Sequence, residues 1–260
     1  MHILRSLVIS ISMFSRFPMP TVDWHGKNMR FVMAFFPIVG VFICLFLLLW
    51  NFLCEVLGFG SFLRGVGFAL IPVLITGAIH LDGFCDTVDA LSSHADAKRK
   101  REILKDPHSG AFAVIAVCCY LLAFAAIASE LYSDYRLVGV FGLVFVLSRC
   151  LSGLAVVWFP NAAGSGLASA FADGATKRTT GVILVFVGAI LIAAMIIIGG
   201  LSAAAAIFGA LTVFAVYRLW LIKAFGGLSG DLAGWFVQVC ELVSLLCLTI
   251  VSRLILGSGS

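Results

Sequence analysis

The sequence predicts an all-α integral membrane protein, a polytopic helical bundle of about seven transmembrane helices preceded by an N-terminal interfacial helix. Hydrophobic residues make up 62% of the 260 residues and charged residues 12%, and the mean hydropathy is +1.14. An average soluble domain has about 25% charged residues. Long apolar runs recur along the chain and basic residues gather in alternate loops. These observations exclude a soluble globular protein.

Seven apolar windows follow one another, each about 20 residues long and so able to cross a hydrocarbon core of about 30 Å. They lie near 31–53, 62–79, 111–131, 137–159, 181–199, 201–221 and 232–256. No long linker separates them, so residues 1–256 are expected to form a single membrane-embedded domain. The terminal GSGS, 257–260, resembles a cloning remnant.

The first twenty residues are not predicted to be a removable signal peptide. Arg5 and Arg16 split the apolar run, Pro18 and Pro20 end it, and it has no small-residue cleavage site. We expect a helix that lies in the membrane interface or re-enters it.

The positions of the basic residues predict the orientation, because Lys and Arg are retained on the cytoplasmic side. With the N-terminus inside, seven passes leave only Arg64, Arg136 and Arg253 outside. The loops 80–110, 160–180 and 222–231 then face the cytoplasm. We expect function on that face, where Gly110 and Gly230 would permit close approach to a ligand. This distribution explains the net charge of +4 without a nucleic-acid partner.

The stretch HLDGFCDTVDAL, 80–91, places three carboxylates on one helical face. At about 100° per residue, Asp86 and Asp89 lie within about 40° of Asp82 around the axis. Like charges at these spacings repel, which favours a bound cation, and oxygen ligands favour Mg²⁺, or Mn²⁺ in its place. Mg²⁺ usually completes its shell with water and substrate phosphate oxygens, so a diphosphate substrate is predicted. The alternative is a solvated acidic helix start.

A second block, KRKREILKDPHSGAF, precedes the next apolar run. The run Lys98–Arg101 is most simply an anchor near lipid head groups, whereas Lys105 beside Asp106 could neutralise phosphate charge. His80 and His108 are both candidate general bases, since imidazole titrates near neutrality, or else structural hydrogen-bonding residues.

Three further charged residues lie in or beside apolar runs: Arg149, Asp231 and Glu241. Ionisable groups within a membrane usually face the bundle interior and pair. We expect Arg149 to pair with Glu241, and Asp231 to join the metal site.

In order along the chain, SRFPMP, AFFPIVG, HLDGFCDTVDAL, REILKDPHSGAF, SRCLSG and GGLSGDLAGWFVQVCELV resemble the cobalamin synthase, or adenosylcobinamide-GDP ribazoletransferase, family. The resemblance implies a Mg²⁺-dependent enzyme of the bacterial cytoplasmic membrane. It would join α-ribazole, or its 5′-phosphate, to the GDP-activated corrinoid adenosylcobinamide-GDP and release GMP, late in vitamin B12 biosynthesis. The residues that match the family's blocks are His80, Asp82, Asp86, Asp89, Lys105, Asp106, Asp231 and Glu241. Arg149 keeps its SR context, and with His108, Gly110, Gly230 and Glu241 it is a candidate substrate-binding residue.

The chain departs from the family pattern at His108, where an arginine is usual, and at Ala113, where a glycine is usual. If a protonated His108 binds phosphate, activity should be unusually sensitive to pH.

Two other classes remain as alternatives. A CDP-alcohol phosphatidyltransferase has alanine and arginine after its first Asp-Gly, where this chain has Phe84 and Cys85, and a prenyltransferase has two aspartate-rich motifs rather than one. A transporter should show paired broken helices in two halves, and no such symmetry is visible. The oligomeric state is open, and a homo-oligomer is compatible with the sequence.

Overall fold

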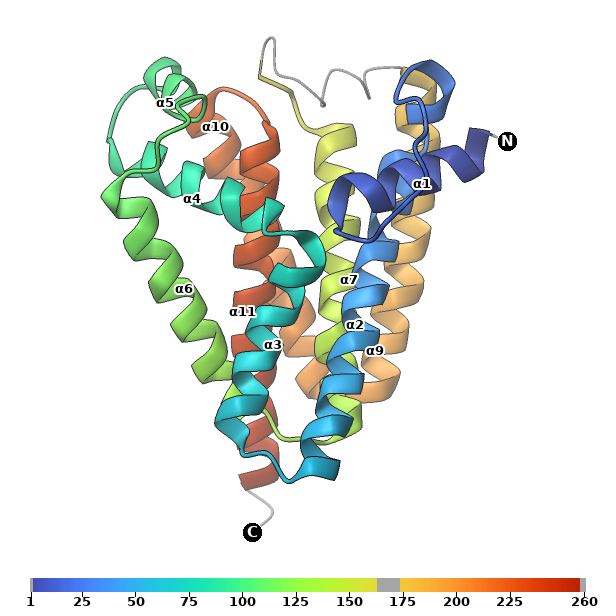
Figure 1. Ribbon diagram of the computed structural model, residues 1–260, viewed down its shortest axis with the longest axis vertical. Helices are drawn as coiled ribbons and strands as arrows, with labels where there is room; N and C mark the ends of the chain where they lie inside the picture. The colour runs from blue at the N-terminus through green and yellow to red at the C-terminus, as the bar shows by residue number, and fades with distance from the viewer. Residues whose placement is uncertain (1, 163–173, 258–260) are drawn as a thin grey trace.

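The computed structural model describes residues 2–162 and 174–257, which form an all-helical bundle (Figure 1). The described part holds no strand beyond an isolated bridge between Asn161 and Leu228. Residues 163–173 of the predicted loop 160–180, and 258–260, lie outside it. The elements are α1 His2–Phe14, η1 Gly26–Met29, α2 Val32–Leu57, α3 Ser61–Thr76, α4 Ile79–Ser92, α5 Ala97–Ile103, α6 Ala111–Glu130, α7 Tyr135–Trp158, α9 Gly174–Val216, η2 Tyr217–Leu221, α10 Ile222–Phe225 and α11 Gly230–Gly257.

The predicted polytopic bundle is confirmed. Five of the described helices are long and apolar enough to cross a membrane, and the bent pair α3 and α4 makes a sixth. One of the five is the stretch Lys177–Phe225, whose 49 residues would span more than twice a hydrocarbon core at about 1.5 Å per residue. Gly200 interrupts it with φ 53° and ψ −130°, and the ribbon folds back, so both ends lie at the same end of the bundle (Figure 1). When this stretch is counted as two passes, the described helices make seven passes in all, the number that the sequence predicts.

The two chain ends lie at opposite ends of the bundle, as an odd number of passes requires (Figure 1). The end that carries α1 also carries α5 and α10, so three regions that are distant in sequence meet there. The opposite end has short connections, tied together by an ion pair from Arg253 to Glu130 (2.9 Å) and a hydrogen bond from Arg64 to Leu131 O (2.7 Å). We call these the site end and the far end.

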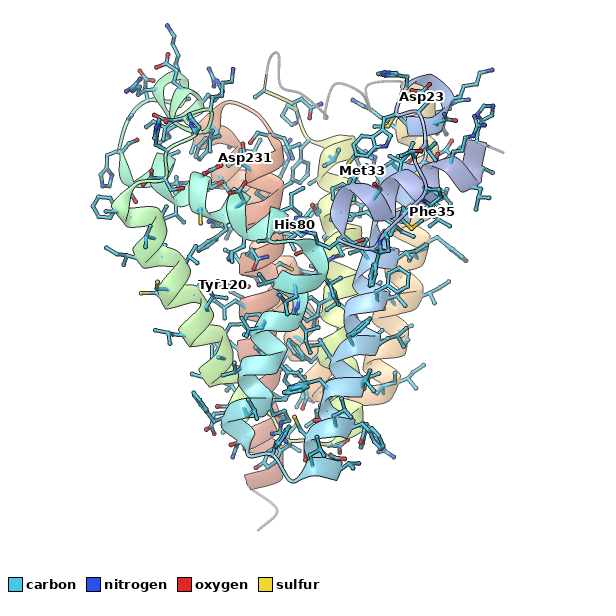
Figure 2. All side chains as sticks on the ribbon, viewed as in Figure 1. Asp23, Met33, Phe35, His80, Tyr120 and Asp231 are labelled. Atoms are coloured by element: carbon cyan, nitrogen blue, oxygen red, sulfur yellow. The ribbon has the colours of Figure 1, made fainter. Side chains whose placement is uncertain are left out.

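The centre of the bundle is α7, which is buried along most of its length between α2, α9 and α11. Large apolar side chains cover the outside of the surrounding helices, among them Leu45, Phe52, Leu122, Phe186 and Ile197 (Figure 2). An outward-facing apolar surface on long helices is expected of a protein in lipid, where the hydrocarbon solvates it.

A bend of 97° turns α4 away from α3, so that α4 lies across the site end rather than along the bundle (Figure 1). Gly77 and Ala78 make the bend with φ of 62° and 64°, a region that L residues other than glycine rarely adopt. Arg16 packs its side chain against Gly77, and its backbone N–H donates to Ile75 O (2.8 Å). The N-terminal segment thereby braces the start of α4.

The helix α1 is 13 residues long, about 20 Å at 1.5 Å per residue, which is too short to span. It runs across the site end beside the top of α2 (Figure 1). This arrangement agrees with the expected N-terminal interfacial helix.

Candidate active site

The helices α4 and α11 pack so closely that glycine is required at their contact. A Cβ on Gly83 would lie 2.8 Å from Asp231 O, and a Cβ on Gly234 would lie 2.9 Å from His80 O. Both obstacles are backbone atoms, which cannot rotate away. This contact sets the first turn of α4, which carries His80 and Asp82, beside the first turn of α11, which begins with Gly230 and Asp231.

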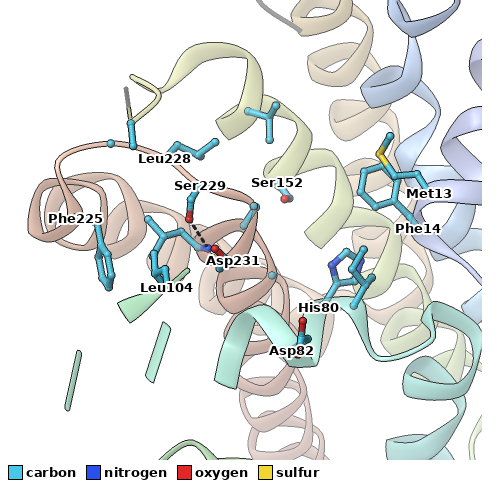
Figure 3. Close-up of a pocket in the computed structure, with 18 of the residues that line it drawn as sticks. Met13, Phe14, His80, Asp82, Leu104, Ser152, Phe225, Leu228, Ser229 and Asp231 are labelled. Carbon is cyan, nitrogen blue, oxygen red and sulfur yellow. Dashed lines mark hydrogen bonds between the residues drawn. The ribbon is translucent and has the colours of Figure 1, made fainter. Parts of the chain in front are cut away.

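A cavity of about 490 Å³ opens at this contact. Asp82 of α4 and Asp231 of α11 both line it (Figure 3). Lys105 and Arg101 line it from the α5 side. Two carboxylates and two cationic side chains in one cavity of this size can bind a charged small molecule and its counterion.

The opposite side of the cavity is apolar and aromatic. Met13 and Phe14 come from α1, Met33 and Phe36 from α2, and His80 from α4. The Phe14 and Phe36 ring centroids are 4.2 Å apart, and the His80 ring lies 6.1 Å from Phe14 and 5.6 Å from Phe36. Figure 3 shows Met13 and Phe14 across His80 from Asp231. The cavity therefore has a charged end and a ring-lined end.

His80 is the residue at the junction of these two ends. It is 5% exposed, and its Nε2 is buried with no hydrogen-bond partner. A neutral imidazole at this position has one nitrogen able to donate a hydrogen bond and the other able to accept one.

The carboxylates on α4 repel one another, as the sequence predicts. Burial, followed by the negative charges of Asp82, Asp231 and Asp89, raises the pKa of Asp86 to about 6. All the neighbouring charges that act on it are negative. A cation bound here would relieve this repulsion and return Asp86 to its ionised form.

Asp89 faces away from this group, toward the start of α6. Its Oδ2 accepts a hydrogen bond from the Gly110 backbone N–H at 2.8 Å. The carboxylate lies directly against the Gly110 α-carbon, where a Cβ would overlap it. In the structure the group that approaches Gly110 is the Asp89 carboxylate.

Asp106 and His108 lie in an exposed loop rather than in the cavity. The His108 ring Nδ1 is 2.8 Å from Asp106 Oδ1, and the two side chains are 89% and 56% exposed respectively. The His108 backbone N–H and then its imidazole lower the pKa of Asp106. The structure pairs these two candidate residues with each other and not with Asp82 or Asp231.

Arg149 and Glu241 form a buried ion pair between α7 and α11, which confirms the expected pairing. Arg149 also donates to Phe145 O (2.8 Å), and Ser148 Oγ donates to Glu241 Oε1 (2.9 Å). Both charged side chains are 1% exposed, and neither lines the cavity. Their placement suits a structural role beneath the site.

Sequence reasoning missed Arg101 as a cavity residue and assigned it to the lipid anchor. In the structure, Arg101 donates to Phe225 O and lines the cavity together with Lys105. The sequence carries no clear signal for this, because α5 ends at Ile103 and Lys105 lies in the turn that follows it. Ser152, three residues after Arg149 in the SRCLSG block, and Ser229 also line the cavity.

The loop before α11 is held in place by backbone contacts. Gly227, with φ 147°, lies against the backbone of Ala162, and Leu228 N–H donates to Pro160 O (2.8 Å). A side chain at Gly227 would collide with that backbone. This loop delivers Ser229 and Gly230 to the cavity wall.

Within 2–162 and 174–257, no three His, Cys, Asp or Glu side chains converge closely enough to hold a metal ion by themselves. The donor set still suits Mg²⁺, which commonly takes only one or two carboxylates and completes its shell with water and substrate phosphates. The uncompensated negative charge on Asp86 is what a divalent cation would offset.

A polytopic helical bundle with a cavity that joins carboxylates, cations and aromatic rings at one membrane face belongs to the class of membrane-embedded enzymes. A family model described as cobalamin-5-phosphate synthase matches residues 6–249. The chain belongs to this family.

Curated relatives agree along the whole chain. It is 38% identical over 257 residues to the adenosylcobinamide-GDP ribazoletransferase of Lachnoclostridium phytofermentans, covering 98% of both chains. It is 31% identical to the protein of the same name from Clostridium botulinum (strain Alaska E43 / Type E3), covering 94% of this chain and 96% of that one. The Geobacillus sp. (strain WCH70) protein of that name is 33% identical over 85% of both chains. No solved structure matches the chain.

Proposed function

We propose that the chain transfers the corrinoid phosphoryl group of adenosylcobinamide-GDP to α-ribazole, or to its 5′-phosphate, and releases GMP. The product is adenosylcobalamin or its 5′-phosphate. Family membership supports the reaction class. The observation that carries the proposal is the cavity that joins Asp82 and Asp231 to Lys105 and Arg101, since a diphosphate needs both a counterion site and direct cationic contacts.

Asp82 and Asp86 are the proposed main ligands of Mg²⁺, with Asp89 and Asp231 as the further carboxylates of the group. When bound, Mg²⁺ supplies neutralisation of charge on the diphosphate oxygens as GMP departs. Asp89 uses Oδ2 to accept the hydrogen bond from the Gly110 N–H and would offer its other oxygen, Oδ1, to the metal.

In the transfer step, the 3′-hydroxyl oxygen of the α-ribazole ribose attacks the phosphorus on the corrinoid side. A new P–O bond forms, and the bond from that phosphorus to the oxygen of GMP breaks. The hydroxyl proton passes from the attacking oxygen to a carboxylate of α4 or to water, and GMP leaves as its phosphate anion. His80 lines the cavity together with Asp82, and its Nε2 has no hydrogen-bond partner in the protein, so it can accept a hydrogen bond from that hydroxyl and orient it.

Lys105 and Arg101 would bind the negative charge of the diphosphate that Mg²⁺ does not neutralise. Their position on the α5 side of the carboxylates suits the departing phosphate of GMP, whose charge grows as the P–O bond breaks. The same cations could accept the 5′-phosphate of a phosphorylated acceptor.

The site end is proposed to face the cytoplasm of a bacterium, with the protein integral to the cytoplasmic membrane. Most of the basic residues lie at that end or in its loops, as the positive-inside rule requires. Arg64, Arg136 and Arg253 lie at the far end, and Arg149 is buried within the bundle. Lipid is the surrounding partner, and the proposal is compatible with a homo-oligomer.

The test is GMP release by the purified, detergent-solubilised protein given adenosylcobinamide-GDP, α-ribazole and Mg²⁺. We expect GMP and a cobalamin product in equal amounts, with no product in EDTA and a loss of about 100-fold or more for Asp82→Asn. Asp134→Asn is the matched control, because Asp134 caps α7 at the far end, where asparagine caps equally well. Folded protein that releases no GMP with any divalent metal would rule the proposal out.

A further inference from the structure

The ring-lined end of the cavity has a composition that the phosphoryl transfer does not require. Phe14, Phe36 and His80 pack against one another with centroids 4.2 to 6.1 Å apart. Met13 and Met33 complete this end, and thioether side chains adapt to the shape of an apolar ligand. Phe14 and Met13 are half-buried, so part of each surface is available to a ligand.

This end adjoins the charged end, so one molecule can reach both. Asp82 and His80 are two residues apart on the first turn of α4, and Figure 3 shows Phe14 directly beyond His80. A molecule with its reacting hydroxyl beside Asp82 and His80 therefore places its attached ring among Phe14, Phe36 and Met13. A nucleoside has this form, a polar ribose joined to a flat base.

Resting on the proposed function, we infer that the ring-lined end binds the benzimidazole base of α-ribazole, with Phe14 of α1 as a specificity-determining residue. The base is a flat, methylated, fused ring with one unsubstituted ring nitrogen as its only hydrogen-bonding atom. Flat rings stack favourably on aromatic side chains, and burial of the two methyl groups among Met and Phe adds apolar contact.

The other substrate parts fit this end poorly. Guanine carries acceptors at O6 and N7 and a donor at N2, and an apolar wall leaves such groups without partners, at a substantial energetic cost. The corrinoid is too large for a cavity of about 490 Å³. The guanosine and corrinoid portions of the donor must therefore lie toward the charged end and outside the cavity.

The assignment gives α1 a second role besides its position in the interface. Since Phe14 is the last residue of α1, the helix supplies one wall of the acceptor subsite. A change at Phe14 should alter the binding of α-ribazole and leave donor binding unchanged.

The experiment compares Phe14→Ala and Phe14→Leu with Phe17→Ala. Phe17 is a matched control from the same segment, since its ring packs on Phe42 (5.0 Å) and does not line the cavity. Binding of radiolabelled α-ribazole is measured by equilibrium dialysis in EDTA, and KM for each substrate is measured with Mg²⁺. Thermal unfolding in detergent checks that each variant is folded.

We expect Phe14→Ala to raise the Kd and KM for α-ribazole about tenfold, the range found for loss of one base-stacking ring. KM for adenosylcobinamide-GDP should stay within about twofold of the original value. Phe14→Leu keeps most of the apolar volume and should give an intermediate effect, which provides the test if Phe14→Ala does not fold. Phe17→Ala should match the unmodified protein.

A second readout uses the base itself. The unmodified protein should prefer the riboside of dimethylbenzimidazole over an adenine riboside, and Phe14→Ala should reduce that preference. If Phe14 variants raise KM for the donor instead, or change neither constant while GMP release continues, the subsite assignment is wrong and the proposed reaction stands. If the unmodified protein neither binds α-ribazole nor releases GMP, the proposed function itself has failed.

Discussion

Two groups of charged side chains lie near each other in this bundle and are treated differently by the fold. Arg149 and Glu241 are buried beneath the cavity and neutralise each other, with Ser148 as an additional donor. The carboxylates of α4 and α11 lie at the site end, and the charges that act on Asp86 are all negative. The protein neutralises the first group by itself, whereas no cationic side chain acts on Asp86 in the second, where Mg²⁺ is the proposed counterion.

This difference separates stability from activity. A buried charge without its partner is costly in an apolar interior, so the Arg149–Glu241 pair should govern whether the protein folds. Repelling carboxylates cost stability and persist where a ligand or a reaction requires them. A change in the Arg149–Glu241 pair should therefore lower stability, whereas a change in the carboxylates of α4 and α11 should lower activity without lowering stability.

The largest effect should come from breaking the buried pair. Arg149→Leu leaves Glu241 buried without its cation and should cost about 3–5 kcal/mol of stability. The measure is thermal or denaturant unfolding in detergent. The double variant Arg149→Leu/Glu241→Leu should recover most of this loss, because no lone charge remains. A single variant as stable as the unmodified protein would contradict the structural role of the pair.

The next effect should be seen in catalysis without a loss of stability. Asp231→Asn removes one carboxylate from the cavity wall and should lower kcat about 100-fold, since that charge is proposed to act on the metal and diphosphate. The unfolding temperature in EDTA should stay the same or rise, because a repulsive charge is gone. A marked drop in unfolding temperature would place Asp231 with the structural group.

The contact between α4 and α11 offers a smaller, geometric test. Gly234→Ala places a Cβ 2.9 Å from His80 O, which should push α4 away from α11 and lower kcat about tenfold, since a small misplacement of reacting groups is costly. Gly139→Ala is the matched control, because a Cβ there meets no atom within 4 Å. Equal activities in the two variants would show that the contact does not set the site geometry.

The charge on Asp86 predicts a pH dependence of stability in metal-free protein. Its pKa is raised from 3.8 to about 6 in the folded state, so folding favours the protonated form. The stabilisation is complete below pH 3.8 and is lost as the pH rises through about 6. Unfolding temperatures in EDTA should therefore fall between about pH 4 and 6.5 and change little above that, and the fall should be smaller in Asp86→Asn. Mg²⁺ at pH 7.5 should restore the temperature in the unmodified protein only.

The sequence was sufficient for those features that depend on local composition. Apolar windows predicted the seven passes, the charge pattern placed the loops at one end, and the helical period brought Asp82 and Asp86 onto one face. The 97° bend could not be predicted, because an alanine with φ 64° at Ala78 carries no sequence signal. It is held by Arg16, about sixty positions earlier in the chain.

The composition of the cavity was also only partly predictable. Asp82, Asp231, Lys105 and His80 were found because charged or titratable residues at a membrane boundary are conspicuous. Phe14 and the neighbouring methionines were not found, because apolar residues in an apolar chain carry no contrast. Only the tertiary fold shows that α1 faces a cavity rather than lipid.

The smallest effect is expected from Asp106 and His108, which test whether lying outside the cavity means lying outside the reaction. They pair with each other in an exposed loop, where an ion pair is weak because water screens it. Asp106→Asn and His108→Ala should therefore change kcat/KM less than about threefold at pH 7.5, against about 100-fold for Asp231→Asn. The measurement is GMP release across pH 5.5 to 8.5. A loss for His108→Ala as large as that for Asp231→Asn, confined to low pH, would mean that a protonated His108 reaches the phosphate, and that this loop moves to the cavity when substrate binds.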